Sequence, residues 1–396
     1  MIDRTLAKKL KKAVTQYPVV TLTGPRQSGK TTLAKMVFPH YTYISLENPD
    51  QRSFAMDDPI SFLQRFKNGV ILDEVQRTPD LFSYIQTMVD EKDQPGQFIL
   101  TGSQNFLLIE KISQSLAGRT AIFHLSPFSK RELLAEKPYH PDNFPLIQVP
   151  KIPYANVWDI IFTGFYPRIH DKKLEAREWL AGYYQTYIER DVRSVINVGD
   201  LDTFGKFIRL CAGRVGQLIN FTSLAADCGI SNMTAKRWLS VLQTSFIVKL
   251  VQPHFENFSK RLIKSPKLYF LDTGLLSFLL NIKNHHELQF HAHKGAIFEN
   301  FVFSELYKSF LNNGLIPNIY YWNDVKKHEV DFVIEKGDKL LPIEVKAGET
   351  LTKDQLKGLM YYRDLAASKV ERPILIYTGI ENYIRNNIQI LSWQNL

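Results

Sequence analysis

The first third of the chain takes its fold from one stretch, Gly24-Pro25-Arg26-Gln27-Ser28-Gly29-Lys30-Thr31-Thr32. Its first eight residues match the pattern G-x-x-x-x-G-K-[ST], in which glycines let backbone N–H groups turn inward around phosphate oxygens. Residues 18–23 before it are typical of a strand, and residues 30–37 after it are typical of a helix whose N-terminus attracts anions. A Gly-rich turn that arose by chance would lack this context. The pattern therefore predicts a loop that holds the phosphates of ATP, with Lys30 at the β- and γ-phosphates and the Thr31 hydroxyl as a ligand of Mg²⁺.

A second motif, Val70-Ile71-Leu72-Asp73-Glu74, is an apolar strand that ends in two acids. Two carboxylates at the carboxyl edge of a parallel sheet repel each other unless a cation lies nearby. We expect Asp73 to coordinate Mg²⁺, directly or through water, and Glu74 to activate the attacking water. The alternative is an acidic turn at the surface.

Two further polar positions are candidates for the same site. The strand over residues 97–101 leads into Ser103 and Gln104, either of which can sense the γ-phosphate, although an ordinary turn at the end of a strand is the alternative. Arg119 is a candidate for a charge-neutralising finger, acting in cis or from a neighbouring subunit. A structural salt bridge is the alternative for this arginine.

Short apolar runs alternate with helical patterns through the first third of the chain. Besides residues 18–23, the runs over 42–45, 70–73, 97–101 and 121–125 are β-rich and nearly continuously apolar, as in strands buried on both faces of a parallel sheet. This alternation predicts an α/β domain. Prolines are frequent in the stretch that follows, which we take as a linker over residues 136–155. The chain is therefore expected to consist of an ATPase-like α/β domain at 1–135, this Pro-rich linker, a helical region at 156–282 and a last α/β domain at 283–396.

Residues 221–252 and 267–271 have the pattern of a winged helix. Residues 223–227 and 232–242 are expected helices separated by a turn at Gly229, and residues 246–251 pair with 267–271 as a hairpin. The net charge of +9 favours an acidic partner such as DNA. A role as a packing module or protein dock is the alternative. The expected DNA contacts are Asn232, Thr234, Lys236 and Arg237 on the second helix and Lys260, Arg261 and Lys264 on the wing.

The last hundred residues contain an acidic constellation. Residues 329–335 and 341–346 read as two strands joined by a turn, and the period of two places Asp331, Glu344 and Lys346 on one face. Such a group can hold a divalent cation and orient a water for phosphodiester attack. It resembles the PD-(D/E)xK nuclease core, and the resemblance implies that Glu299 on a preceding helix is a further acid, with Gln355 as another member. Val330 stands where that family often has proline. The alternatives are a nuclease-like scaffold without catalysis and a solvated hairpin face.

These motifs together resemble the prokaryotic AAA-type ATPases that carry a C-terminal domain of unknown function. The resemblance rests on residues 24–33, on Leu72-Asp73-Glu74-Val75-Gln76, on Leu100-Thr101-Gly102-Ser103 and on Leu116-Ala117-Gly118-Arg119. It continues through Gly164-Phe165-Tyr166-Pro167, Tyr187-Ile188-Glu189-Arg190-Asp191 and Leu271-Asp272-Thr273-Gly274-Leu275, and so covers nearly the whole chain. It implies the phosphate-loop and acidic-strand roles for Lys30, Thr31, Asp73 and Glu74, and it leaves the biological purpose open.

Composition limits the remaining choices. The two cysteines, Cys211 and Cys228, make no metal-ligand spacing and fit a reducing cytosol. No secretory signal is expected, and charges interrupt every long apolar run, so we expect a cytoplasmic protein that does not cross a membrane. The leading hypothesis is an ATPase that couples hydrolysis to DNA binding and to metal-dependent DNA cleavage, with a second divalent cation in the last domain. The alternative is a nucleotide-driven switch whose inactive nuclease-like domain docks a protein partner. A homo-oligomer is compatible with both.

Overall fold

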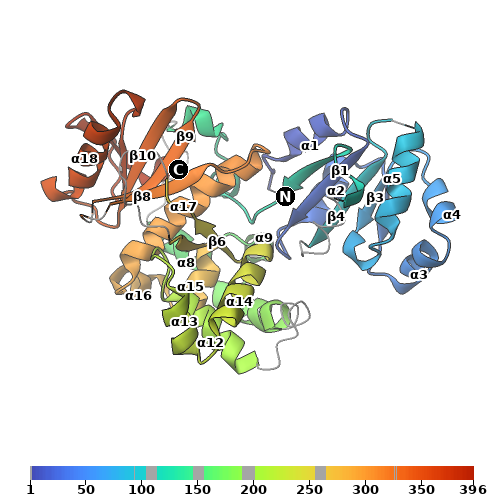
Figure 1. Ribbon diagram of the computed structural model, residues 1–396, viewed down its shortest axis with the longest axis horizontal. Helices are drawn as coiled ribbons and strands as arrows, with labels where there is room; N and C mark the ends of the chain where they lie inside the picture. The colour runs from blue at the N-terminus through green and yellow to red at the C-terminus, as the bar shows by residue number, and fades with distance from the viewer. Residues whose placement is uncertain are drawn as a thin grey trace. The chain divides into compact units, whose positions relative to one another are not determined.

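The computed structural model describes residues 2–92, 94–103, 114–145, 156–189, 201–254, 265–324, 326 and 328–396. The chain folds into two compact units (Figure 1). The first comprises Met1–Phe128 with the short segments Thr244–Phe246 and Leu311–Leu315, and the second comprises Ser129–Gln243, Ile247–Phe310 and Ile316–Leu396. The predictions for Gln104, Arg190, Asp191, Lys260, Arg261 and Lys264 and for residues 146–155 of the linker lie outside the described residues.

The first unit contains a parallel sheet of five strands in the order β2-β3-β4-β1-β5. Every strand expected from the sequence is present, with bounds that differ by no more than two residues. The carboxyl ends of all these strands therefore meet at one edge, where the predicted phosphate loop and acids lie. The strands are β1 (Val19–Gly24), β2 (Thr42–Ser45), β3 (Val70–Asp73), β4 (Phe98–Ser103) and β5 (Thr120–His124).

Alternate residues of the central strands face two separate apolar cores. Val70 and Leu72 pack with α3 (Pro49–Asp57), α4 (Pro59–Gln64) and α5 (Leu81–Lys92). Ile71 packs on the opposite face with α1 (Ala7–Ala13) and α2 (Lys30–Val37). The predicted burial on both faces is therefore confirmed for the central strands, whereas β2 and β5 are partly exposed because they form the edges of the sheet.

The second unit begins with helices and a hairpin. The helices expected at 223–227 and 232–242 are present and longer, and the expected hairpin forms as an antiparallel pair. Within the predicted helical region, one helix starts at Ala176 and becomes π-helical over Tyr184–Glu189. The elements are α8 (Val157–Thr163), α9 (Pro167–Lys172), α10 (Ala176–Tyr183), α12 (Leu201–Ala212), α13 (Phe221–Cys228), α14 (Asn232–Thr244), β6 (Val248–Val251), β7 (Lys267–Phe270), α15 (Thr273–Leu279) and α16 (His285–Phe290).

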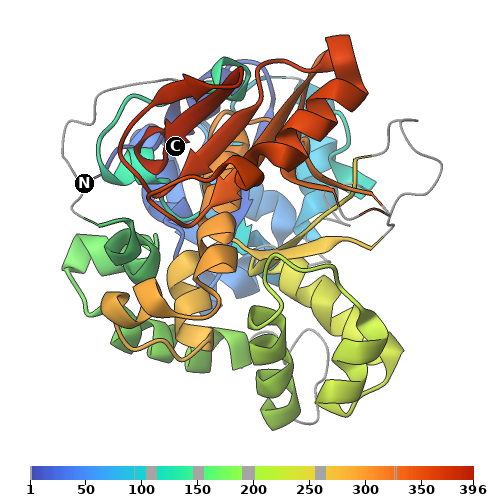
Figure 2. The same ribbon diagram turned by 90° about the vertical axis from the view of Figure 1, so that its left-hand side faces the viewer.

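A mixed sheet of six strands follows, in the order β12-β13-β11-β10-β9-β8. The predicted hairpin of β9 and β10 is confirmed, with Ile343 opposite Phe332, and β10 pairs in parallel with β11. Figure 2 shows the orange helix α17 against the orange-to-red strands of this sheet. The elements are α17 (Lys294–Asn312), β8 (Ile319–Asn323), β9 (Glu329–Lys336), β10 (Lys339–Lys346), α18 (Lys357–Ala366), β11 (Ile374–Tyr377), β12 (Tyr383–Arg385) and β13 (Ile388–Ser392).

The hairpin and the C-terminal sheet, predicted as parts of two domains, form one unit because their backbones are bonded to each other. His254 N–H donates to the carbonyl of Tyr321 on β8 at 2.7 Å, and Tyr321 N–H donates to the carbonyl of Gln252 at 3.1 Å. Asn300 of α17 also binds the backbone of β7. Its side chain accepts from Phe270 N–H at 2.6 Å and donates to the Phe270 carbonyl at 3.0 Å.

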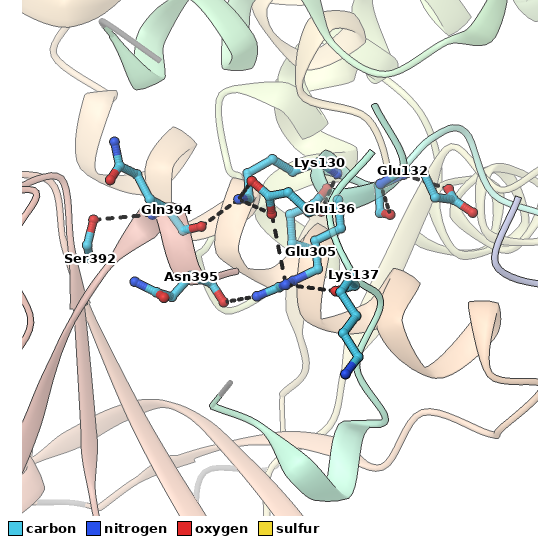
Figure 3. A network of polar contacts seen from close by, with 10 residues as sticks. Lys130, Glu132, Glu136, Lys137, Glu305, Ser392, Gln394 and Asn395 are labelled. Carbon is cyan, nitrogen blue, oxygen red and sulfur yellow. Dashed lines mark hydrogen bonds and ion pairs between the residues drawn. The ribbon is translucent and has the colours of Figure 1, made fainter. Parts of the chain in front are cut away.

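The N-terminal segment of the first unit ends at Phe128, before the boundary expected at residue 135, and α7 (Lys130–Leu133) is bonded into the second unit. Figure 3 shows the buried ammonium of Lys130 between the Glu136 carboxylate, at 3.0 Å, and the backbone carbonyl of Gln394, at 2.6 Å. The Lys130 N–H also donates to the Glu305 carboxylate at 2.7 Å. Across the described ranges, no helix has both the length and the apolar character needed to span a membrane.

Candidate functional site

The loop between β1 and α2 adopts the conformation that its glycines allow. Gly24 has a φ of 148° and Gly29 a φ of 91°, both in the left-handed half of the map that disfavours side chains. A Cβ at Gly24 would lie 2.2 Å from the carbonyl oxygen of Leu125, so no larger residue fits there. Gly29 is followed directly by the first residue of α2, so the loop delivers the N-terminus of that helix to the carboxyl edge of the sheet.

The Lys30 ammonium lies inside this loop. It donates to the carbonyls of Gly24 at 3.0 Å and Pro25 at 2.8 Å. Burial lowers the pKa of Lys30 to about 8, although Glu74 and Asp73 oppose the shift. The Ser28 hydroxyl is fully buried in the same loop and has no hydrogen-bond partner among the described residues. An ammonium held by two carbonyls and an unsatisfied hydroxyl fit a site built for phosphate oxygens.

Asp73 lies beside the start of α2, as the sequence predicts. Its Oδ2 atom accepts from the Thr31 hydroxyl at 2.8 Å and from the Tyr43 hydroxyl at 2.9 Å, and its Oδ1 atom accepts from the Thr101 hydroxyl. Burial, followed by the Asp73 charge, raises the pKa of Tyr43 to about 12, so the phenol remains a donor. The donor set of one carboxylate and one hydroxyl fits Mg²⁺, which binds through few protein oxygens. Sequence reasoning missed Tyr43, because nothing in residues 42–45 distinguishes its side chain from that of an ordinary edge-strand residue.

Glu74 follows Asp73 in a left-handed conformation, with a φ of 55°. Burial raises the pKa of its carboxyl, while the neighbouring Lys30 opposes the shift. The Gln76 side chain donates to Glu74 Oε2 at 2.5 Å and so fixes the direction of the carboxylate. A partly buried carboxylate of raised pKa, held beside the phosphate loop, suits a general base.

Ser103 and Arg119 lie at opposite ends of the sheet. Ser103 pairs with Gly24 in the strand register, and its hydroxyl has no hydrogen-bond partner among the described residues. Arg119 directly precedes β5 and lies beside the start of β1. Because a strand rises about 3.3 Å per residue, the start of β1 is about 16 Å from the phosphate loop at its other end. Its guanidinium pairs with Asp90, donating through Nη2 at 2.9 Å. That position leaves no role in cis, so the catalytic alternative for Arg119 is a role across a subunit interface.

Arg4 supports the phosphate loop from the start of the chain, which the sequence analysis did not anticipate. Its guanidinium donates to the carbonyl of Ser28 at 3.1 Å and to the carbonyl of Ser126 at 2.6 Å. The side chain is buried against the ring of Phe128, at 4.8 Å from the ring centroid. Arg4 therefore joins the loop to the segment after β5, and only the tertiary structure brings these positions together.

The acidic residues predicted in the C-terminal domain also lie together. Asp331 Oδ2 accepts from the Val345 N–H at 2.8 Å, and the Lys346 ammonium lies 2.5 Å from Glu344 Oε1. Glu299 of α17 faces the same group. The Gln355 carboxamide instead accepts from the N–H of Thr352 at 2.9 Å and caps a helical turn.

A lysine that the sequence analysis did not single out lies among these acids. The Lys267 ammonium, from the first residue of β7, is 3.5 Å from Glu299 Oε1 and 4.0 Å from Asp331 Oδ1, and it also pairs with Glu329. Within the described ranges, no group of three His, Cys, Asp or Glu side chains is arranged to hold a metal ion. The residues that the structure describes therefore provide no ligand set for the predicted second divalent cation.

Burial and the neighbouring charges shift the pKa values of the groups in this cluster. Burial, followed by the charge of Asp331, raises the pKa of Glu344 to about 8. Burial also raises the pKa of Glu299 to about 7, although Lys267 opposes the shift. For Lys267 itself burial opposes protonation, but the carboxylates of Glu299, Asp331 and Glu329 outweigh burial and raise the pKa of its ammonium.

The raised pKa of Glu344 predicts a dependence of stability on pH. A carboxyl whose pKa is higher in the folded state stabilises the fold fully below about pH 4.5, and this contribution is lost as the pH rises through about 8. Glu344→Gln mimics the neutral carboxyl. We therefore expect the melting temperature of the variant, relative to that of the unmodified chain, to increase between pH 5 and pH 9. The exposed Glu349→Gln serves as a control, and an equal dependence for both variants would contradict this expectation.

A parallel sheet with this loop, lysine, hydroxyl and acid pair has the architecture of a P-loop nucleoside triphosphatase. Family models match three consecutive parts of the chain: an AAA domain at residues 16–134, a domain of unknown function (DUF8612) at 154–286 and another (DUF4143) at 294–396. Uncharacterised proteins of Mycobacterium bovis and Mycobacterium tuberculosis are each 32% identical over 352 residues, which cover 88% of this chain and 74% of the relative. The chain belongs to the prokaryotic AAA-type ATPases with a C-terminal domain of unknown function, which confirms the resemblance.

Solved structures resemble the chain more distantly. A Walker-type ATPase of Pyrococcus abyssi is 14% identical, with a TM-score of 0.42 over 70% of this chain and 96% of that one. A RuvB variant of Thermotoga maritima is 17% identical, with a TM-score of 0.30 over 63% of this chain and 89% of that one.

Proposed function

We propose that the chain hydrolyses Mg-ATP at the carboxyl edge of the first sheet. The observation that carries this proposal is the placement of the Lys30 ammonium, the Thr31 hydroxyl and the Asp73 carboxylate around one loop, with Thr31 and Asp73 joined at 2.8 Å. The family and the P-loop architecture support nucleotide binding independently.

Each residue of the site has a distinct proposed role. Backbone N–H groups of residues 26–32 and the Lys30 ammonium bind the phosphates and neutralise the charge that develops on them. Thr31 and Asp73 hold Mg²⁺, which supplies charge neutralisation and orients the terminal phosphates. Glu74 accepts a proton from the attacking water, and Gln76 keeps its carboxylate in position. Ser103 contacts the γ-phosphate through its hydroxyl.

We further propose that hydrolysis is coupled to DNA binding through α14. Lys236 and Arg237 lie on this helix, and the chain carries a net charge of +9. On the same helix, Asn232 donates to the Thr222 hydroxyl at 3.2 Å, and Thr234 is hydrogen-bonded to Ser231 at 2.8 Å. These polar side chains are already engaged, so phosphate contacts from the basic residues fit this helix better than readout of base edges.

Hydrolysis rates with and without duplex DNA, measured across a salt series, test this proposal. We expect Mg-dependent hydrolysis that DNA stimulates, with the stimulation falling steeply as salt rises because phosphate contacts release counterions. The exchange Lys236→Glu with Arg237→Glu should remove the stimulation and leave the basal rate unchanged. A hydrolysis rate that does not change with DNA would instead favour a nucleotide-driven switch that docks a protein partner. Absence of Mg-ATP hydrolysis would contradict the proposal that the chain is an ATPase.

A further inference from the structure

The acidic cluster of the C-terminal domain surrounds a lysine that belongs to the preceding hairpin. The ammonium of Lys267 lies between α17 and β9, within 4.0 Å of carboxylates on both elements. Its side chain is only 4% exposed. Tyr269, two residues along β7 and so on the same side of the strand, donates its hydroxyl to Glu299 Oε1 at 2.5 Å. One strand thus contributes both a cation and a hydrogen-bond donor to these acids.

The backbone of β7 is fixed on both sides, so Lys267 is part of the folded core rather than of a lid. β6 pairs with β7 along one side. Along the other, Gly216 N–H donates to the Leu268 carbonyl at 2.8 Å, and Ile219 N–H donates to the Pro266 carbonyl at 2.8 Å. The Tyr321 hydroxyl of β8 donates to the Ser265 carbonyl at 2.5 Å, just before the lysine. The ammonium therefore remains with the acids whenever this unit is folded.

The ammonium and a divalent metal compete for the same carboxylates. A metal ion needs several oxygens at about 2.0 to 2.6 Å around its centre. Glu299 and Asp331 both face the Lys267 ammonium at ion-pair distance, and Lys346 pairs with Glu344 at 2.5 Å. Of the buried carboxylate oxygens of this cluster that the structure describes, Glu344 Oε2 has no hydrogen-bond partner. The ammonium groups of Lys267 and Lys346 therefore pair with the carboxylates that a divalent cation would need as ligands.

We propose that the Lys267 ammonium is the resident cation of this acidic cluster, in the place that a nuclease core would give to a metal ion. The folded chain then takes up no divalent cation at Asp331 and Glu344. The cluster joins the hairpin to the C-terminal sheet through ion pairs. This proposal goes beyond ATP hydrolysis, and it is tested by metal binding in the absence of nucleotide.

The test is a gain of metal binding. The pair Lys267→Met with Glu329→Gln removes one positive and one negative charge, so that the net charge of the cluster is kept. We expect this variant to bind one more Mn²⁺ per chain than the unmodified protein, as measured by Mn²⁺ paramagnetic resonance and calorimetry on the full chain. Addition of Asp331→Asn should abolish the extra site. The matched control is Lys249→Met, a lysine of β6 that lies over the Tyr307 ring and should bring no extra Mn²⁺.

Two results would overturn the proposal. The first is Mn²⁺ binding by the unmodified chain that Asp331→Asn removes, since the ammonium would then not exclude the metal. The second is a folded variant, shown by circular dichroism, that gains no Mn²⁺ site. Should the paired variant fail to fold, the comparison of the unmodified chain with Asp331→Asn alone still decides the matter, because equal Mn²⁺ binding by these two supports the proposal and a loss contradicts it.

Discussion

Lys30→Ala should lower ATP turnover by at least about 100-fold, the usual effect of removing one donor to transition-state charge. The ammonium is buried inside the loop at 3.0 Å from the Gly24 carbonyl, so water cannot replace it at the phosphates. ATP binding should weaken as well, because the same charge contacts the phosphates before hydrolysis. Turnover is measured by release of inorganic phosphate, and binding by fluorescence of a labelled nucleotide.

A second variant separates binding from chemistry. Glu74→Gln keeps the shape of the side chain and its contact with Gln76, but it removes the base that accepts the proton of water. We expect it to bind ATP as the unmodified chain does while losing turnover to a similar extent as Lys30→Ala. The exposed Lys11→Ala on α1 controls for the loss of one positive charge. Hydrolysis by Lys30→Ala at the unmodified rate would remove the central assignment.

The phosphate loop and the two acids at the end of β3 could be predicted because the residues of each motif are close together in the sequence. The spacing of Gly24, Gly29 and Lys30 defines one turn, and Asp73 follows from the end of an apolar strand. Tyr43 and Arg4 belong to the same site but depend on strand order and on the path of the first helix. Neither property is encoded in a short pattern, so these residues appear only in the folded chain.

In the C-terminal cluster, too, the residues of one hairpin could be predicted from the sequence, whereas the residue from another part of the chain could not. The period of two along the strands correctly placed Asp331, Glu344 and Lys346 on one face, because a hairpin fixes its own register. Lys267 comes from another hairpin and reaches the cluster through the bonds that join Gln252 and His254 to β8. The one signal in the sequence was a lysine in the otherwise apolar run from residue 267 to 271. A buried lysine needs a partner, and that requirement indicates acids nearby without saying which.

The second large effect concerns stability, and it arises where the segments Gly164-Phe165-Tyr166-Pro167 and Leu271-Asp272-Thr273-Gly274-Leu275 meet. Asp272→Ala should lower the free energy of unfolding of the second unit by about 2 to 6 kcal/mol, since two buried N–H groups lose their acceptor at about 1 to 3 kcal/mol each. Asp272 Oδ2 accepts from Phe165 N–H at 2.8 Å, and Oδ1 accepts from Leu275 N–H at 2.9 Å. The carboxylate thus caps α15 and fixes the turn between α8 and α9. Chemical denaturation followed by circular dichroism gives the free energy.

The decrease in the free energy of unfolding should depend on how many hydrogen-bond acceptors remain at position 272. Asp272→Asn keeps one oxygen in place, so it should cost roughly half as much as the alanine variant, and its amide nitrogen would face one of the two donors. Asp338→Ala removes an exposed carboxylate from the turn between β9 and β10 and should change stability by less than about 0.5 kcal/mol. Equal stabilities for Asp272→Ala and Asp338→Ala would mean that the motif at residues 271–275 does not hold the helices together.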